Sequence, residues 1–255
     1  MTPQLASPFQ QEKTFIIVPQ QFQKIKRTDE IIKALILDSG TLINLSMNGL
    51  LYILEELKKK SNVRFLVTEQ VKYEIIDHPI AIPRFELGAL EIRALIDNKT
   101  IELPEVLSVT ESEIKSKTNY LMHLANQTIN AKGKWIKIVS DAEMSCLALS
   151  SILIERGIEN IIAIDERTTR ILAEKPQNLE KLISSRLHIR IRVEAKNLVD
   201  FRGFRFIRST ELVYVAFKKN LLKIKDPKVL EAVLYATKFK GSSVSYDEIN
   251  ALKKF

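Results

Sequence analysis

A chain of 255 residues with 45% hydrophobic and 27% charged residues can bury an ordinary core, as one large domain or as a domain with an extension. The single cysteine excludes an internal disulfide, and no apolar run approaches the roughly 20 residues that span a membrane. Residues 186–225 contain eleven Lys and Arg residues and three acidic ones, so this segment alone accounts for the net charge of +8. Such a local excess of positive charge favours a polyanionic partner.

The first 30 residues are rich in glutamine and follow no clear period, so we expect residues 1–30 to form an N-terminal arm. They lack the basic start and the apolar stretch of a signal peptide. We therefore expect a cytoplasmic protein without a membrane partner. Cys146 lies on an apolar helix face, which predicts a core residue rather than a nucleophile.

Two apolar runs lead directly into aspartates. Residues 34–37 precede Asp38 and residues 161–164 precede Asp165, a pattern typical of strands buried on both faces of a parallel sheet. The elements expected between them are a helix at 42–57, a strand at 63–67, a helix at 69–77 capped by Thr68, a helix at 85–96, a strand at 100–103, and helices at 111–131 and 141–156. This alternation predicts an α/β fold with a central, mainly parallel sheet flanked by helices.

Residues 187–194 alternate apolar and polar side chains, which predicts a half-exposed strand at a sheet edge. We end the α/β domain, residues 31–194, at this strand and assign residues 195–255 to a basic, helical C-terminal extension. Its expected helices are one at 211–224, one that begins after Asp226 and ends at Gly241, and a last one with a capping box of Ser245 and Glu248.

Five acidic residues occupy positions that a parallel sheet brings together. Asp38 and Asp165 follow strands, Glu74 lies in the helix after the second strand, and Asp141 and Glu143 begin a later helix. The carboxyl ends of parallel strands and the starts of the following helices share one edge, so we expect these groups to converge. Carboxylates gathered there repel one another unless a divalent cation neutralises them, and oxygen ligands favour Mg²⁺ or Mn²⁺.

Each of these acids also has a structural interpretation. Asp38 and Asp165 suit turns and helix caps, and Asp141 and Glu143 suit the positive end of a helix dipole. Glu74 taken alone is expected to lie on the solvent-exposed face of its helix. The functional interpretation therefore depends on the whole set.

Four blocks of sequence carry the acids: Leu-Ile-Leu-Asp-Ser-Gly-Thr-Leu-Ile at 35–43, Phe-Leu-Val-Thr-Glu-Gln-Val-Lys-Tyr-Glu-Ile at 65–75, Val-Ser-Asp-Ala-Glu-Met-Ser-Cys-Leu-Ala-Leu at 139–149 and Ile-Ala-Ile-Asp-Glu at 162–166. Together they resemble the PIN-domain family of metal-dependent nucleases, and most closely the branch that includes the ribosomal RNA processing endonucleases. The resemblance implies a PIN-like three-layer fold over residues 31–193. It implies that four acids bind the metal ion: Asp38, Glu74, Glu143 and Asp165. It further implies that Asp141 and Glu166 are supporting acids.

Two positions depart from the family pattern. Gly40 stands where the family often has Ser, Thr or Asn, and Glu143 stands where Asp is common. The zinc ribbon of the processing branch is excluded by the single cysteine. Neither departure removes a charge from the acidic set.

The resemblance implies a ribonuclease in which Mg²⁺ or Mn²⁺ polarises an RNA phosphodiester and activates a water molecule for endonucleolytic cleavage. The acids that would carry this catalysis are Asp38, Glu74, Asp141, Glu143 and Asp165. It further implies RNA as the partner, a homodimer, and a protein regulator or ribosomal partner.

Candidate substrate-binding residues come from the basic segment. Arginines interleaved with phenylalanines suit phosphate contacts and base stacking, whereas the alternative is that the phenylalanines form core. The candidates are Arg190, Arg192, Arg202, Arg205 and Arg208.

Two other functions stay open. An aspartate-nucleophile phosphatase of the haloacid dehalogenase type also places Asp after an apolar strand, but its second Asp would fall at Gly40. A non-catalytic RNA-binding or assembly protein could keep the fold without the activity, and the intact acidic set argues against it.

Overall fold

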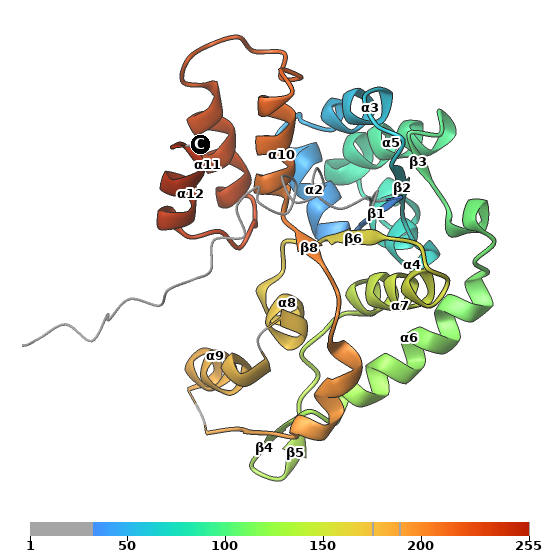
Figure 1. Ribbon diagram of the computed structural model, residues 1–255, viewed down its shortest axis with the longest axis vertical. Helices are drawn as coiled ribbons and strands as arrows, with labels where there is room; N and C mark the ends of the chain where they lie inside the picture. The colour runs from blue at the N-terminus through green and yellow to red at the C-terminus, as the bar shows by residue number, and fades with distance from the viewer. Residues whose placement is uncertain (1–32, 175, 189, 255) are drawn as a thin grey trace, which may run out of the picture.

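The computed structural model describes residues 33–174, 176–188 and 190–254, so the expected N-terminal arm lies outside the described residues. Its centre is a five-stranded parallel sheet in the order β3-β2-β1-β6-β8 (Figure 1). The strands are β1 (Ala34–Leu37), β2 (Arg64–Leu66), β3 (Ile101–Glu102), β6 (Asn160–Ala163) and β8 (Phe206–Ile207). The predicted α/β fold is confirmed.

The two apolar runs form the central pair of strands. All residues of β1 and β6 are buried, and their register pairs Leu37 with Ala163. The main-chain N–H of Asp38 continues the ladder by donating to the carbonyl of Ala163 at 3.0 Å. Asp38 and Asp165 therefore follow neighbouring strands at the same edge of the sheet.

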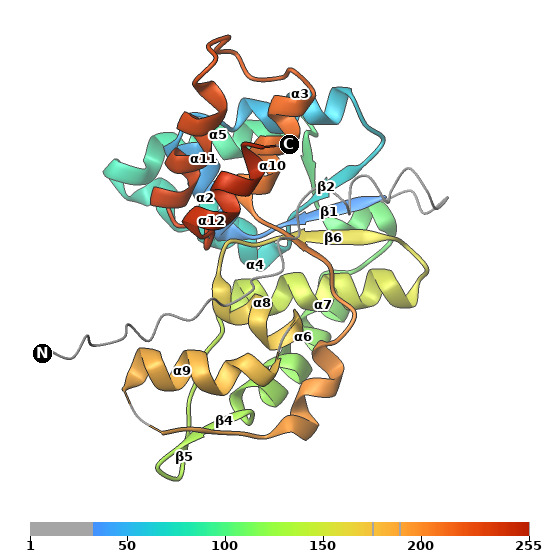
Figure 2. The same ribbon diagram turned by 60° about the vertical axis from the view of Figure 1, so that its left-hand side comes forward.

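Helices cover both faces of the sheet and give three layers (Figure 2). On one face α7 (Asp141–Glu155) packs on β1 and β6, and α6 (Glu111–Asn126) packs on α7. The other face carries α2 (Ser39–Met47), α3 (Tyr52–Lys59) and α5 (Pro83–Asp97). Thr68 caps α4 (Glu69–Lys72) as predicted, and the same helical segment continues as the π-helical turn η1 (Tyr73–Asp77).

The single helix expected at 42–57 is wrong, because the chain forms α2 and α3 with a break between them. Gly49 adopts a φ of +62° at the break, in the left-handed region that glycine enters at no steric cost. Asn48 supports the end of α2 by donating from its side-chain amide to the carbonyl of Asn44 at 2.9 Å. The recurring leucines made both helices look like one.

The helix expected at 111–131 ends early, at Asn126, and the rest forms a small antiparallel sheet in the order β5-β4-β7. Lys132 and Gly133, both with positive φ, connect β4 (Ile129–Ala131) to β5 (Lys134–Trp135), which is the geometry of a tight hairpin. The strand expected at 187–194 is reduced to β7 (Arg192–Val193), because α9 (Leu179–Leu187) occupies its beginning.

The C-terminal segment is not only helical, since β8 is an edge strand of the central sheet. After β8 come α10 (Ser209–Lys218), α11 (Val229–Phe239) and α12 (Tyr246–Leu252), and the predicted capping box of Ser245 and Glu248 begins α12. A small separate core holds them together, formed by Tyr214, Leu234, Val244, Ile249 and Leu252. The remaining helical segments are η2 (Pro79–Ala81), η3 (Pro104–Leu107), α8 (Arg167–Glu174), η4 (Pro176–Asn178) and η5 (Ala195–Phe201).

Among the described helices, none combines the length and the apolar composition that crossing a lipid bilayer requires. Cys146 is buried in the main core, as its apolar surroundings in the sequence predicted.

Candidate functional site

Asp38 is a buried carboxylate at the end of β1 and the N-cap of α2. Its Oδ2 accepts a hydrogen bond of 3.1 Å from the main-chain N–H of Gly40, whereas Oδ1 has no hydrogen-bond partner among the described residues. The pKa of Asp38 is raised to about 7, chiefly by burial and also by the charges of Glu143 and Glu74, against the opposing effect of main-chain donors. The side chain is therefore both a helix cap and an incompletely satisfied acid.

The glycine at position 40 matters to this acid. A Cβ atom added there would lie 3.2 Å from Asp38 Oδ2, closer than an ordinary van der Waals contact. The absence of a side chain lets the carboxylate lie close to position 40, where it accepts a hydrogen bond from the main-chain N–H of Gly40.

Glu143 is half-buried and stands in the first turn of α7. Its carboxylate accepts from the main-chain N–H of Ser140 at 2.9 Å, in a capping box, and from the hydroxyl of Thr169 at 2.9 Å. Burial raises the pKa of Glu143, and the nearby charge of Glu166 raises it too, while the hydrogen bonds lower it. The helix start and α8 together fix the position of this acid.

Glu74 lies in the π-helical turn η1, a kind of turn found often at functional sites. It is half-buried, and the side-chain amide of Gln70 reaches its Oε1 at 3.5 Å. Its charge raises the pKa of Asp38, so the two carboxylates are within electrostatic reach of each other. Asp38, Glu74 and Glu143 form what we call the acidic triplet.

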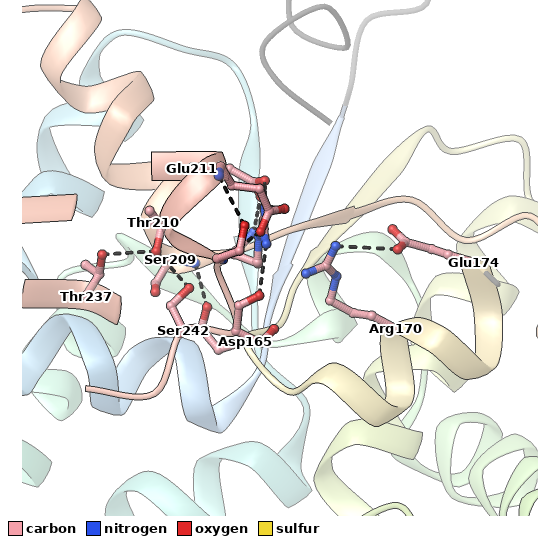
Figure 3. A network of polar contacts seen from close by, with 12 residues as sticks. Asp165, Arg170, Glu174, Ser209, Thr210, Glu211, Thr237 and Ser242 are labelled. Atoms are coloured by element: carbon pink, nitrogen blue, oxygen red, sulfur yellow. Dashed lines mark hydrogen bonds and ion pairs between the residues drawn. The ribbon is translucent and has the colours of Figure 1, made fainter. Parts of the chain in front are cut away.

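Asp165 is buried beside the triplet, but it has its own partners. Its Oδ1 accepts from the main-chain N–H of Ser209 at 2.9 Å, and its Oδ2 accepts from the side-chain amide of Asn44 at 3.1 Å. Figure 3 shows Asp165 next to Ser209, in a polar network that continues through Thr210 to Thr237 and Ser242. Both carboxylate oxygens are thus committed to α2 and α10.

Two supporting acids serve neighbouring helices. Asp141 is exposed and forms an ion pair of 3.3 Å with Lys137, four residues earlier in the segment that precedes α7, so it does not enter the acidic site. Glu166 accepts a hydrogen bond of 2.8 Å from the main-chain N–H of Thr169 at the start of α8. The structural interpretation of Asp141 as a helix-start residue accounts for its position.

The arrangement of the predicted ligands bears on whether they can bind a metal ion. The described residues contain no group of three or more His, Cys, Asp or Glu side chains close enough to hold an ion. By chemistry, carboxylates that repel one another, with Asp38 Oδ1 buried without a partner, suit a hard divalent cation, but in this structure the three side chains of the acidic triplet do not lie close enough together to hold one. Each oxygen of Asp165 accepts one hydrogen bond and keeps a further lone pair, so Asn44 and Ser209 hold this carboxylate in place without excluding it as a metal ligand.

The predicted substrate-binding arginines fall into three groups. Arg190, Arg192 and Arg202 are exposed, while Arg205 forms an ion pair with Glu159. Arg208 is buried, which contradicts its prediction as a phosphate contact. Its guanidinium binds the carboxylates of Glu211 and of Glu248, the latter at 2.9 Å, and the carbonyl of Ser243 at 2.9 Å.

The carboxylates of Glu211 and Glu248 decide the charge state of Arg208. Burial lowers its pKa, but these two neighbours raise it by more, so the guanidinium stays charged inside the protein. The expectation of base stacking in this segment is also wrong for Phe201 and Phe206, because both rings are buried in the main core.

Sequence reasoning missed three partners of the acids: Asn44, Thr169 and Ser209. Asn44 carried a usable signal, because it is a polar residue between the core leucines of α2, and it is fully buried. Ser209 acts through its main-chain N–H, which any residue other than proline supplies. No pattern of side chains could have identified it.

Comparisons of the chain with protein-family models, curated proteins and solved structures found no match in any of the three.

Proposed function

We propose that this chain is a divalent-metal-dependent ribonuclease that cleaves RNA endonucleolytically at the acidic triplet. The observation that supports the proposal is the buried carboxylate of Asp38, which lacks a partner for one oxygen and is surrounded by the charges of Glu74 and Glu143. Open parallel sheets place their reacting groups at this edge. The four sequence blocks that resemble the PIN-domain family contain the same acids.

In this proposal Asp38, Glu74 and Glu143 hold Mg²⁺ or Mn²⁺. The ion, when bound, supplies Lewis acidity and lowers the pKa of a bound water molecule. Asp38 contributes a carboxylate whose direction is set by the N–H of Gly40, and Ser140 and Thr169 orient Glu143. Asp165 positions α2 and α10 around the site through both of its carboxylate oxygens.

The test is cleavage of a mixed pool of structured and single-stranded RNAs in Mg²⁺, in Mn²⁺ or in EDTA. We expect metal-dependent cleavage by the wild type and none by Asp38→Asn, because the variant keeps the shape of the side chain and loses its charge. Asp141→Asn is the matched control, since Asp141 is exposed and paired with Lys137, and we expect it to cleave normally. Equal cleavage by wild type and Asp38→Asn would remove the basis of the proposal.

A non-catalytic RNA-binding protein is the second candidate. The spacing of the acids favours it, because no three acidic side chains of the described residues lie close enough together to hold an ion. RNA binding that falls steeply with salt and survives Asp38→Asn, without cleavage in either metal, would support this alternative. The cytoplasmic location remains a proposal that rests on the sequence, while a homodimer and a protein regulator or ribosomal partner remain proposals that rest on the resemblance.

A further inference from the structure

Three aromatic rings gather on the outer surface of the last two helices, and we call them the aromatic platform. Tyr235 and Phe239 of α11 are stacked, with ring centroids 6.2 Å apart and planes inclined by 22°. Tyr246 of α12 lies with its centroid 6.1 Å from that of Tyr235. Phe239 is 70% exposed and Tyr246 is 54% exposed, so both present ring surface to solvent.

The platform is not needed to build the C-terminal core. That small core consists of buried side chains on the opposite sides of the helices, and Tyr235 is the only platform ring packed against it. A large apolar ring such as Phe239 is usually buried. Its exposure beside two further aromatic rings is therefore a feature that calls for a binding partner.

Positive charges border the rings. Lys238 Nζ lies 4.4 Å from the centroid of the Tyr246 ring and donates a hydrogen bond to the carbonyl of Val244. Lys240, which follows Phe239, is exposed, and exposed Lys228 precedes α11 about three helical turns before Phe239 on the same side. The acids on this side are Glu231, which is paired with Lys253, and exposed Asp247, which follows Tyr246 and is outnumbered by the three lysines. The border thus complements a polyanion.

The platform adjoins the acidic edge of the sheet. The turn between α11 and α12 is attached to that edge by a hydrogen bond of 3.2 Å from the N–H of Ser243 to the carbonyl of Asp165. Arg208 adds a bond of 2.9 Å to the carbonyl of Ser243. Figure 1 shows α11 and α12 side by side, with their connecting turn near the end of β6.

We propose that the aromatic platform binds single-stranded RNA by stacking unpaired bases on Phe239 and Tyr246, while Lys238 and Lys240 contact the phosphates. Bases in a single strand expose both faces of their rings, and aromatic side chains with basic neighbours recognise them without sequence preference. A duplex buries those faces and does not fit this surface. The inference rests on the proposed function in taking RNA as the substrate, and it deepens that function by selecting unpaired RNA.

The experiment measures fluorescence anisotropy of a labelled 10-nucleotide oligouridylate and of an abasic oligonucleotide of equal length, in EDTA and low salt. All proteins carry Asp38→Asn, so that no cleavage occurs. We expect Phe239→Leu to weaken oligouridylate binding about tenfold and to leave the abasic probe unchanged, because it removes the aromatic face and keeps an apolar side chain. Phe239→Trp should restore the affinity.

Phe85→Leu is the matched control, because Phe85 is also an exposed phenylalanine on a helix, at 44%, but lies on α5. Equal affinities of the Phe239→Leu and Phe85→Leu proteins for oligouridylate, or no binding by the parent protein, would overturn the platform. A sedimentation change from dimer to monomer caused by Phe239→Leu, with RNA affinity unchanged, would instead assign the surface to a second copy of the chain. Binding without cleavage by the protein with native Asp38 would reject the nuclease and keep the platform.

Discussion

The main-chain N–H of Ser209 donates a hydrogen bond to Asp165 Oδ1 at 2.9 Å. This bond joins the first residue of α10 to the aspartate that follows strand β6. The second oxygen of Asp165 accepts from Asn44, whose amide also donates to the carbonyl of Thr237 in α11 at 2.8 Å. One carboxylate thereby connects the sheet, α2 and the C-terminal helices. Four predictions follow from this relationship and from its neighbours.

Asp165→Asn should destabilise the fold by about 1–3 kcal/mol, because an amide cannot accept hydrogen bonds at both of its polar atoms and one buried donor loses its partner. The free energy of unfolding is measured by urea denaturation. Asp141→Asn, at an exposed position, is expected to stay within about 0.5 kcal/mol of the wild type. If both variants were equally stable, the role of Asp165 as a structural junction would be refuted.

Asp38→Asn should stabilise the protein at neutral and alkaline pH. The folded-state pKa of about 7 lies above the ordinary value of 3.8, so the folded state binds the proton more tightly and stability falls as pH rises between these values. The gain from the variant should be on the order of 4 kcal/mol at pH 8 and should vanish near pH 4. Urea denaturation at several pH values, in EDTA, measures this; a gain that does not depend on pH would contradict the stated cause.

Arg208→Met should destabilise the C-terminal helices by about 3–5 kcal/mol, because it leaves the buried carboxylate of Glu248 without its cation. Hydrogen exchange should show faster exchange in α10–α12 than in α7. Lys253→Met provides the comparison, since it breaks the partly exposed pair with Glu231 and is expected to cost less than about 1 kcal/mol. Similar losses in the two variants would show that Arg208 does not anchor this segment.

Gly49→Ala should cost about 1 kcal/mol, because the break between α2 and α3 requires a φ of +62°, which alanine adopts only with strain. The space around the position is open, so no clash contributes. Gly88→Ala tests steric overlap instead of backbone strain, since an added Cβ there would lie 2.9 Å from Ser46 Oγ. A neutral Gly49→Ala substitution would show that this break tolerates another conformation.

Local signals in the sequence determined the elements that depend on near neighbours. The apolar runs before Asp38 and Asp165 predicted the two buried strands at the centre of the sheet, since doubly buried strands carry no polar alternation. Thr68, Ser245 and Glu248 predicted helix starts because capping joins residues three positions apart. The candidate acids came from the same local patterns together with the resemblance.

The tertiary structure decided which of those acids have partners. Asp165 is bonded to Asn44 and Ser209, which are 121 and 44 positions away, and no spacing rule relates them. Arg208 was predicted from its basic segment to contact phosphate, but packing placed it beside Glu248. Charge and periodicity are properties of neighbouring residues, whereas burial and long-range hydrogen bonds exist only once the chain has brought distant segments together.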